Sequence, residues 1–110
     1  MADHGVSGVL EDVRLAVYGS LASTGRLPSA DALAELAGSQ VRAAAAIVEL
    51  AQQRAWALGA SGEIELAHPF ATRSFGYSVM SARTLWWGGC CWDSFAIPHL
   101  VPDCGPVVIA

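Results

Sequence analysis

The 110-residue chain contains no lysine, and charged residues of all kinds make up only 15% of it. Its six basic residues are all arginines, and ten acidic residues bring the formal net charge to −4. Nucleic-acid-binding proteins generally present a basic surface, so this balance argues against a nucleic-acid partner. Low charge combined with 54% hydrophobic residues also excludes intrinsic disorder, which requires the opposite composition.

Long apolar runs are missing as well. The longest runs, such as residues 43–50, fall well short of the ~20 residues that a membrane-spanning helix needs. The first residues show neither the basic nor the apolar segment of a secretory signal, so we expect a cytoplasmic protein with no membrane partner. Three cysteines cannot complete a disulfide framework, and free thiols in a reducing compartment indicate chemistry, soft-metal binding or buried packing.

The first half of the chain is rich in alanine, leucine and valine at helical spacing. This pattern predicts three helices, over residues 7–22, 29–37 and 39–54, the second and third of which begin at the capping residues Ser29 and Ser39. In the third helix we expect the following residues to face the core: Val41, Ala44, Ile47, Val48 and Ala51. A β-hairpin is expected next, from residues 56–58 and 64–66 around a glycine-containing turn. Three helices and a hairpin predict a winged-helix-like part over residues 1–66.

The chain after residue 59 contains most of the aromatic residues and prolines, several glycines and all the cysteines. The alternation of Phe75, Tyr77 and Val79 predicts a strand that pairs with a second one over residues 84–87. A short helix is expected over residues 90–97, ending before Pro98, and a buried strand over residues 107–109. The fold class is therefore α+β, with a small, incomplete mixed β/α catalytic part over residues 67–110. A terminal strand without neighbours predicts a homodimer or aggregation.

The residues best suited to chemistry lie at the start of the expected fourth helix. At Cys90, unpaired backbone N–H groups and the positive end of the helix dipole favour a thiolate, the form that attacks and binds soft metals. Asp93 follows three residues later on the same helical face, within reach of anything bound to the sulfur. The competing interpretation is packing, because free cysteines are among the most buried residues.

Glycines and tryptophans surround this cysteine in the sequence. Gly88 and Gly89 have no Cβ, which lets a ligand approach the backbone closely. Trp86, Trp87 and Trp92 are expected to shield the site from water. Together with the cysteine and the carboxyl group, they predict a soft nucleophile beside a proton carrier in an apolar pocket.

The segment WGGCCWDSFAIP (residues 87–98), preceded by AHPF (residues 67–70), resembles the alkylmercury lyase (organomercurial lyase) family. The similarity runs from about Leu10 to Pro98 and is specific in the Cys-x-x-Asp segment. In that family a cysteine and an aspartate at this spacing cleave the carbon–mercury bond, and by the match these are Cys90 and Asp93. The resemblance further implies a helical N-terminal cover, an organomercurial as substrate, no organic cofactor, and cellular thiols that remove the metal product.

Enzymes of the family share the mercury with a second, distant cysteine. Cys104 is the one cysteine downstream in this chain, in a loop-like PDCGP setting, and it is a candidate second metal ligand. Cys91 is the other candidate, although adjacent side chains on a helix point about 100° apart. The departure from the family pattern predicts a fragment, a truncated product or a non-catalytic relative.

Two other functions stay open. The first is capture of mercury or another thiophilic metal without turnover, through Cys90 together with Cys91 or Cys104. The second is a winged-helix regulator that responds to metal; Arg42 and Arg54 flank its third helix, but Glu49 between them makes a poor phosphate-binding surface.

The histidines receive lesser roles. His68, just before Pro69, is expected in a turn or in a hydrogen bond rather than as a metal ligand. His99 is expected at the surface, although its position near the site also allows a supporting role. His4 is expected to belong to the terminal tail.

Overall fold

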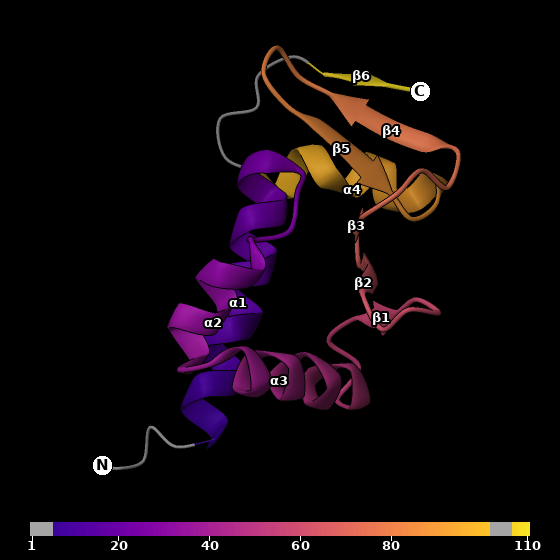
Figure 1. Cartoon of the computed structure of the whole chain (residues 1–110). Helices are drawn as coiled ribbons and strands as arrows, with labels where there is room; N and C mark the ends of the chain where they lie inside the picture. Colours follow the sequence, from indigo (N-terminus) through magenta and orange to yellow (C-terminus); the bar gives the residue numbers. More distant parts are fainter. Residues whose placement is uncertain (1–5, 102–106) are drawn as a thin grey trace.

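The computed structural model describes residues 6–101 and 107–110, which form the α+β protein that the sequence predicts (Figure 1). In chain order the elements are α1 (Val6–Thr24), α2 (Ala30–Ala37), α3 (Gln40–Gln52), β1 (Ala57–Leu58), β2 (Ile64–Ala67), β3 (Phe70–Ala71), β4 (Tyr77–Met80), β5 (Leu85–Gly88), α4 (Cys91–Leu100) and β6 (Val108–Ile109). None of the described helices is long and apolar enough to cross a membrane.

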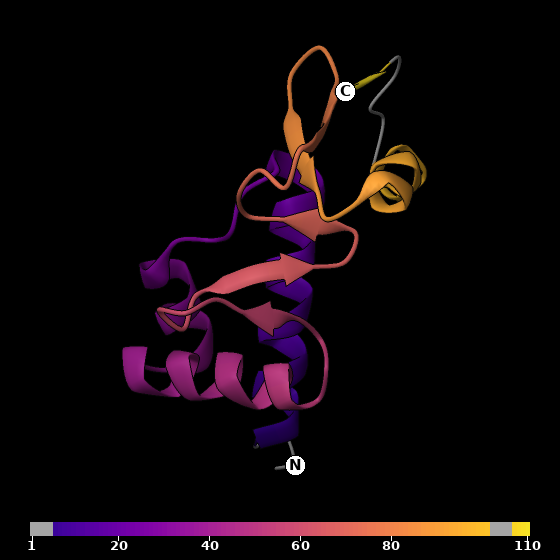
Figure 2. The ribbon, with the colours of Figure 1, turned by 90° about the vertical axis from the view of Figure 1, so that its right-hand side faces the viewer.

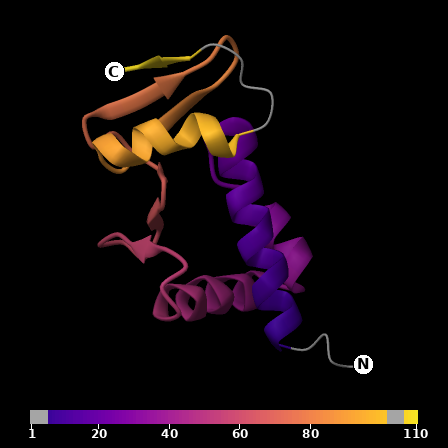
Figure 3. The same ribbon diagram turned by 180° about the vertical axis from the view of Figure 1, so that it is seen from behind.

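The strands form one sheet in the order β1-β2-β3-β5-β4-β6, with every neighbouring pair antiparallel. Helix α4 packs against β4 and β5, behind them in Figure 1 and in front of them in Figure 3. Helices α1, α2 and α3 pack together, and α1 extends up to β5 (Figure 2). Because β2 covers residues 64–67 and pairs with β3, the sheet runs through the predicted boundary at residue 66; the division into two parts stays a prediction.

Local sequence signals explain where α2 and α3 begin and where α2 ends. The hydroxyl oxygen of Ser29 accepts the N–H of Ala32 at 3.1 Å, and Ser39 accepts that of Arg42 at the same distance. These bonds satisfy N–H groups that a helix start leaves unpaired. Gly38 closes α2 in the left-handed region, with φ 104°, which a glycine adopts without strain. The predicted first two helices and the start of the third are confirmed.

The predicted inward face of α3 is wrong at three of its five residues, Val41, Ala44 and Val48, while Ile47 and Ala51 pack against the core as expected. Its buried residues are Ala43, Ala46 and Leu50, whereas Val41 is 79% exposed and Val48 is 47% exposed. Of the other expected core residues, Ala44 is exposed, and Ile47 and Ala51 are partly buried. The reason is the alanine run from residue 43 to 46, which gives little contrast between faces, while its small side chains allow α3 to pack closely against α1 and α2.

The predicted end of the fourth helix is also corrected, because α4 continues through Pro98 to Leu100. A proline removes one helical N–H and crowds the preceding turn, but the residues after it can still complete a turn. Here the N–H of Val101 donates to the carbonyl of Ile97 at 3.2 Å, which closes the last turn beyond the proline.

The last strand is present but is not buried. β6 pairs with β4, with Val79 opposite Ile109 and Met80 opposite Val108. It lies at the outer position of the sheet order, where it has one neighbouring strand, so Val108 is 59% exposed and Ile109 is 37% exposed. Three consecutive apolar residues indicated burial on both faces, but strand position in the sheet decides burial and the run does not specify that position.

The hairpins predicted at residues 56–66 and 75–87 are confirmed as β1–β2 and β4–β5. Three aromatic side chains connect the helices to β5 or to the segment just before β1 through main-chain carbonyls. The Tyr18 hydroxyl donates to Ala55 at 2.6 Å, the Trp56 indole N–H donates to Ile47 at 3.1 Å, and the Trp86 indole N–H donates to Ala22 at 3.1 Å. The core thus runs continuously from the helices into the sheet.

Tyr18 gives the folded protein a pH-dependent stability. Burial raises the pKa of its phenol, an effect that nearby Arg14 partly offsets. The folded pKa therefore lies above the unfolded value of about 10, so the contribution of the neutral phenol is complete below that pH and is lost as pH rises through the folded pKa. We expect urea denaturation to show a fall in the free energy of unfolding above about pH 10 that is smaller in Tyr18→Phe. Equal pH slopes for the two proteins would contradict this, and Tyr77→Phe, at a tyrosine that is 39% exposed, is the matched control.

Candidate functional site

Cys90 is the N-cap residue of α4, between strand β5 and the first helical turn. Its backbone is extended (φ −158°, ψ 179°), and its carbonyl accepts the N–H of Ser94 at 3.0 Å and the Ser94 hydroxyl at 3.2 Å. The thiol itself is free and exposed, and it makes no capping hydrogen bond. The sulfur therefore stands at the positive end of the helix dipole and is accessible to a ligand.

Asp93 lies in the first turn of the same helix, with its side chain only 17% exposed. Its Oδ2 is 2.9 Å from Nδ1 of His68, whose side chain is 68% exposed. When Asp93 is a carboxylate it can only accept a hydrogen bond, and Nδ1 of the imidazole is then the donor in this contact. The predicted hydrogen-bonding role of His68 is confirmed, and its partner is the carboxyl group that the sequence singled out.

The sheet brings these residues together across 25 positions of the chain. His68 lies in the turn between β2 and β3, and Phe70 of β3 pairs with Gly88 at the end of β5. One residue farther, the N–H of Gly89 donates to the carbonyl of Pro69 at 3.4 Å. The turn that carries His68 is therefore attached to the segment that leads into α4.

The two glycines before Cys90 do not leave open space for a ligand, contrary to our expectation. A Cβ on Gly88 would collide with the Ser94 hydroxyl. A Cβ on Gly89 would lie 2.6 Å from Oδ2 of Asp93 and would also meet Leu66. The missing side chains therefore make room for the chain's own residues, including the carboxylate held by His68.

The predicted tryptophan shield is also corrected. Trp92 is 80% exposed, on the outer side of α4. Trp86 is 3% exposed because it belongs to the core beneath α1, and Trp87 is partly buried. Successive side chains point to opposite faces of a strand and in different directions around a helix. Aromatic residues that are close to a cysteine in sequence therefore need not lie over its sulfur.

The structure does not describe the side chains of the other two predicted metal ligands. The side chain of Cys91 and the whole of Cys104 lie outside what the structure describes, as does His4. His99 is exposed in the last turn of α4, as expected. Among the side chains that are described, no three from His, Cys, Asp or Glu come together as a metal site.

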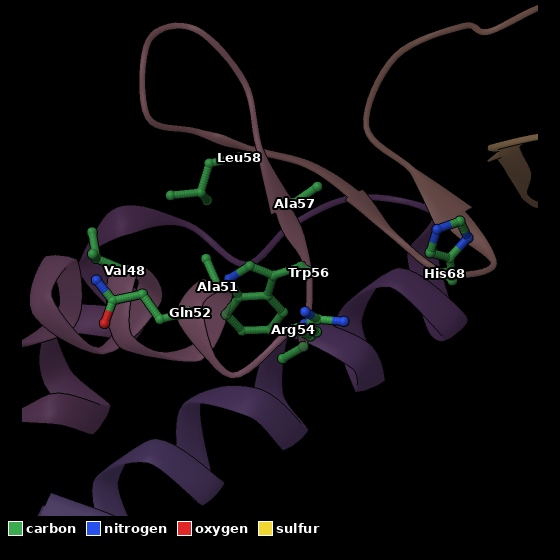
Figure 4. Close-up of a pocket in the computed structure, with 9 residues that line it drawn as sticks. Val48, Ala51, Gln52, Arg54, Trp56, Ala57, Leu58 and His68 are labelled. Carbon is green, nitrogen blue, oxygen red and sulfur yellow. The ribbon is translucent and has the colours of Figure 1, made fainter.

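A groove of about 500 Å³ opens between the C-terminal end of α3 and strand β1 (Figure 4). It is lined by Val48, Ala51, Gln52, Arg54, Ala55, Trp56, Ala57, Leu58 and His68. His68 lies at the opposite end from Val48 and Gln52 (Figure 4). The sequence did not indicate this groove, because six of its nine lining residues are apolar ones that are also typical of a core.

No protein-family model, curated protein or solved structure matches the chain. The candidate site is defined by the chemistry of Cys90, Asp93 and His68. These three residues combine an accessible thiol, an enclosed carboxyl group and an imidazole that fixes one carboxyl oxygen.

Proposed function

We propose that the chain is an organomercurial lyase-like protein that cleaves the carbon–mercury bond of compounds R–HgX. Cys90 is the nucleophile and mercury ligand, and Asp93 is the proton carrier. The observation that supports this best is the pairing of an exposed sulfur at the start of α4 with an enclosed carboxyl group in its first turn. The resemblance of residues 87–98 to the alkylmercury lyase family supplies the reaction type.

The proposed reaction has two chemical steps. Mercury(II) prefers thiolate to oxygen ligands, so the sulfur of Cys90 forms a bond to mercury, X⁻ leaves, and the thiol proton passes to the carboxylate of Asp93. The carbon–mercury bond then breaks as its electron pair takes that proton from the carboxylic acid, which releases R–H and leaves Cys90–S–Hg⁺. Two small thiols remove the metal as Hg(SR′)₂, restore the Cys90 thiol and release one proton.

For the N-terminal part we propose a winged-helix-like arrangement. Three packed helices followed directly by the antiparallel β1–β2 hairpin support it. We further propose that this part covers the catalytic part rather than reading DNA. The net charge of −4 supports that role, because phosphate binding depends on clustered basic side chains.

Capture of mercury without turnover is the second candidate function. It is favoured by the exposure of the Cys90 thiol, since a soft metal can bind a thiolate without help from an acid. In this case the protein retains mercury but leaves the organic group attached or releases no hydrocarbon.

The experiment that tests both functions follows benzene release from phenylmercury by the reduced protein, without oxygen and with excess small thiol. A lyase is expected to release benzene beyond one equivalent, and Cys90→Ser is expected to release none. Stoichiometric mercury retention without benzene would support capture and overturn the lyase proposal. Neither release nor retention would contradict both.

A further inference from the structure

We propose that His68 is a positioning residue for Asp93: it holds Oδ2 of the carboxyl group, so that the other oxygen carries the proton between the sulfur of Cys90 and the carbon of the substrate. This inference rests on the proposed lyase function. It adds a third residue to the Cys-x-x-Asp segment, one that lies 25 positions away from the aspartate.

Two neighbours determine where the carboxylate oxygen lies. Nδ1 of His68 lies 2.9 Å from Oδ2, within hydrogen-bond distance, and donates to it when Asp93 is a carboxylate. On another side, the Cα of Gly89 faces the same oxygen so closely that a Cβ would come within 2.6 Å of it. With only 17% of the Asp93 side chain exposed, the carboxyl group has little freedom to reorient while the hydrogen bond is present.

The imidazole is fixed relative to the helix start through the backbone. Phe70 pairs with Gly88, and the carbonyl of Pro69 accepts the N–H of Gly89. The turn that presents His68 is thus bonded to the residues that immediately precede Cys90. A group supported by a sheet holds its partner more accurately than one on a free loop, which is the arrangement that a proton carrier requires.

A positioning role predicts a specific kinetic effect. Misplacing a reacting group by about 1 Å costs up to about 10²-fold in rate, and losing the partner that orients a ligand or acid costs about 10–100-fold. For His68→Gln we therefore expect kcat for benzene release to fall about 10–100-fold. KM for phenylmercury is expected to change little, because Cys90 binds the mercury.

Asparagine provides the conservative rescue. Its amide nitrogen is two bonds from Cβ, as is Nδ1 of histidine, whereas the amide nitrogen of glutamine is one bond farther away. His68→Asn therefore places an N–H donor near the position of Nδ1, within hydrogen-bond distance of Oδ2, and His68→Gln does not. We expect the asparagine variant to keep most of the wild-type kcat.

The decisive comparison is kcat and KM for phenylmercury in the wild type, His68→Gln and His68→Asn, with mercury retention and the thermal midpoint measured alongside. A low kcat in the glutamine variant only, at unchanged retention, supports the positioning role. Unchanged kcat in the glutamine variant, equal loss in both variants, or loss of mercury retention would overturn it while leaving the lyase proposal standing. Absence of benzene from the wild type would overturn both.

Gly89→Ala tests the same idea without altering either partner, and it decides the matter should His68→Gln fail to fold. The new Cβ occupies the space beside Oδ2 and displaces the carboxylate from His68. We expect a lower kcat at unchanged mercury retention, and a wild-type kcat in this variant would contradict the proposal.

Discussion

Asp93→Ala is expected to abolish benzene release from phenylmercury while leaving stoichiometric mercury retention intact. The sulfur of Cys90 is exposed on its own and needs no partner to bind a soft metal, so capture does not depend on the carboxyl group. Breaking the carbon–mercury bond does depend on the carboxyl group, because negative charge develops on carbon and a proton must be transferred to it. A positioned general acid contributes about 10²–10⁴-fold, so we expect kcat to fall by at least about 10²-fold.

Asp93→Asn refines this test. An amide oxygen can still accept the hydrogen bond from His68, so the local structure is preserved, but an amide cannot carry the proton. We expect the asparagine variant to be as inactive as the alanine variant. If it kept substantial activity, Asp93 would be a structural residue and the proton would come from elsewhere.

The control variant is Asp31→Ala, which removes the first-turn aspartate of α2 instead of that of α4. Both changes remove a negative charge from a helix start, where the dipole favours it by about 0.3–1 kcal/mol. Asp31 is exposed and lies on a different element, so its variant should retain full turnover. A comparable loss of activity in Asp31→Ala would show that the effect of Asp93 is one of helix stability.

The sequence predicted the parts of the fold that depend on neighbouring residues. The helix starts at Ser29 and Ser39 follow from side-chain oxygens that reach N–H groups three residues away. The hairpins follow from alternation around short turns. The face of α3 was predicted only in part and the burial of β6 incorrectly, because each depends on which distant element packs against the segment. An alanine run or a short apolar strand is compatible with several answers.

In the candidate site, too, local spacing was predictable from the sequence and the non-local contact was not. Cys90 is the N-cap of α4 and Asp93 lies in its first turn, and their spacing in the sequence is sufficient to predict that both belong to one helix start. The partnership of Asp93 with His68 depends on the register in which Phe70 meets Gly88, and no local pattern specifies that register. The available signal was a histidine that precedes a proline between two predicted strands. It predicted a hydrogen bond but did not identify the residue that makes it.

Trp86→Ala is expected to be strongly destabilising, and Trp92→Ala is its matched control in the same chain. Trp86 is 3% exposed in β5, and its indole N–H donates to the carbonyl of Ala22 in α1, so one side chain joins the sheet to the helices. Truncating a buried tryptophan leaves a cavity and costs about 3–5 kcal/mol. The last carbonyls of a helix lack helical partners, so the variant also leaves the Ala22 carbonyl without its donor.

Urea denaturation at neutral pH measures the difference directly. A domain of this size is stabilised by about 5–15 kcal/mol, so Trp86→Ala is expected to lose a large part of that and to unfold at a much lower urea concentration. Trp92 is 80% exposed, and replacing it is expected to change the free energy of unfolding by no more than about 0.5 kcal/mol. If the two variants lost equal stability, the indole of Trp86 would not be the connection between α1 and the sheet. A large loss only at Trp86 would support the contact between β5 and α1 as a main contribution to the stability of the fold.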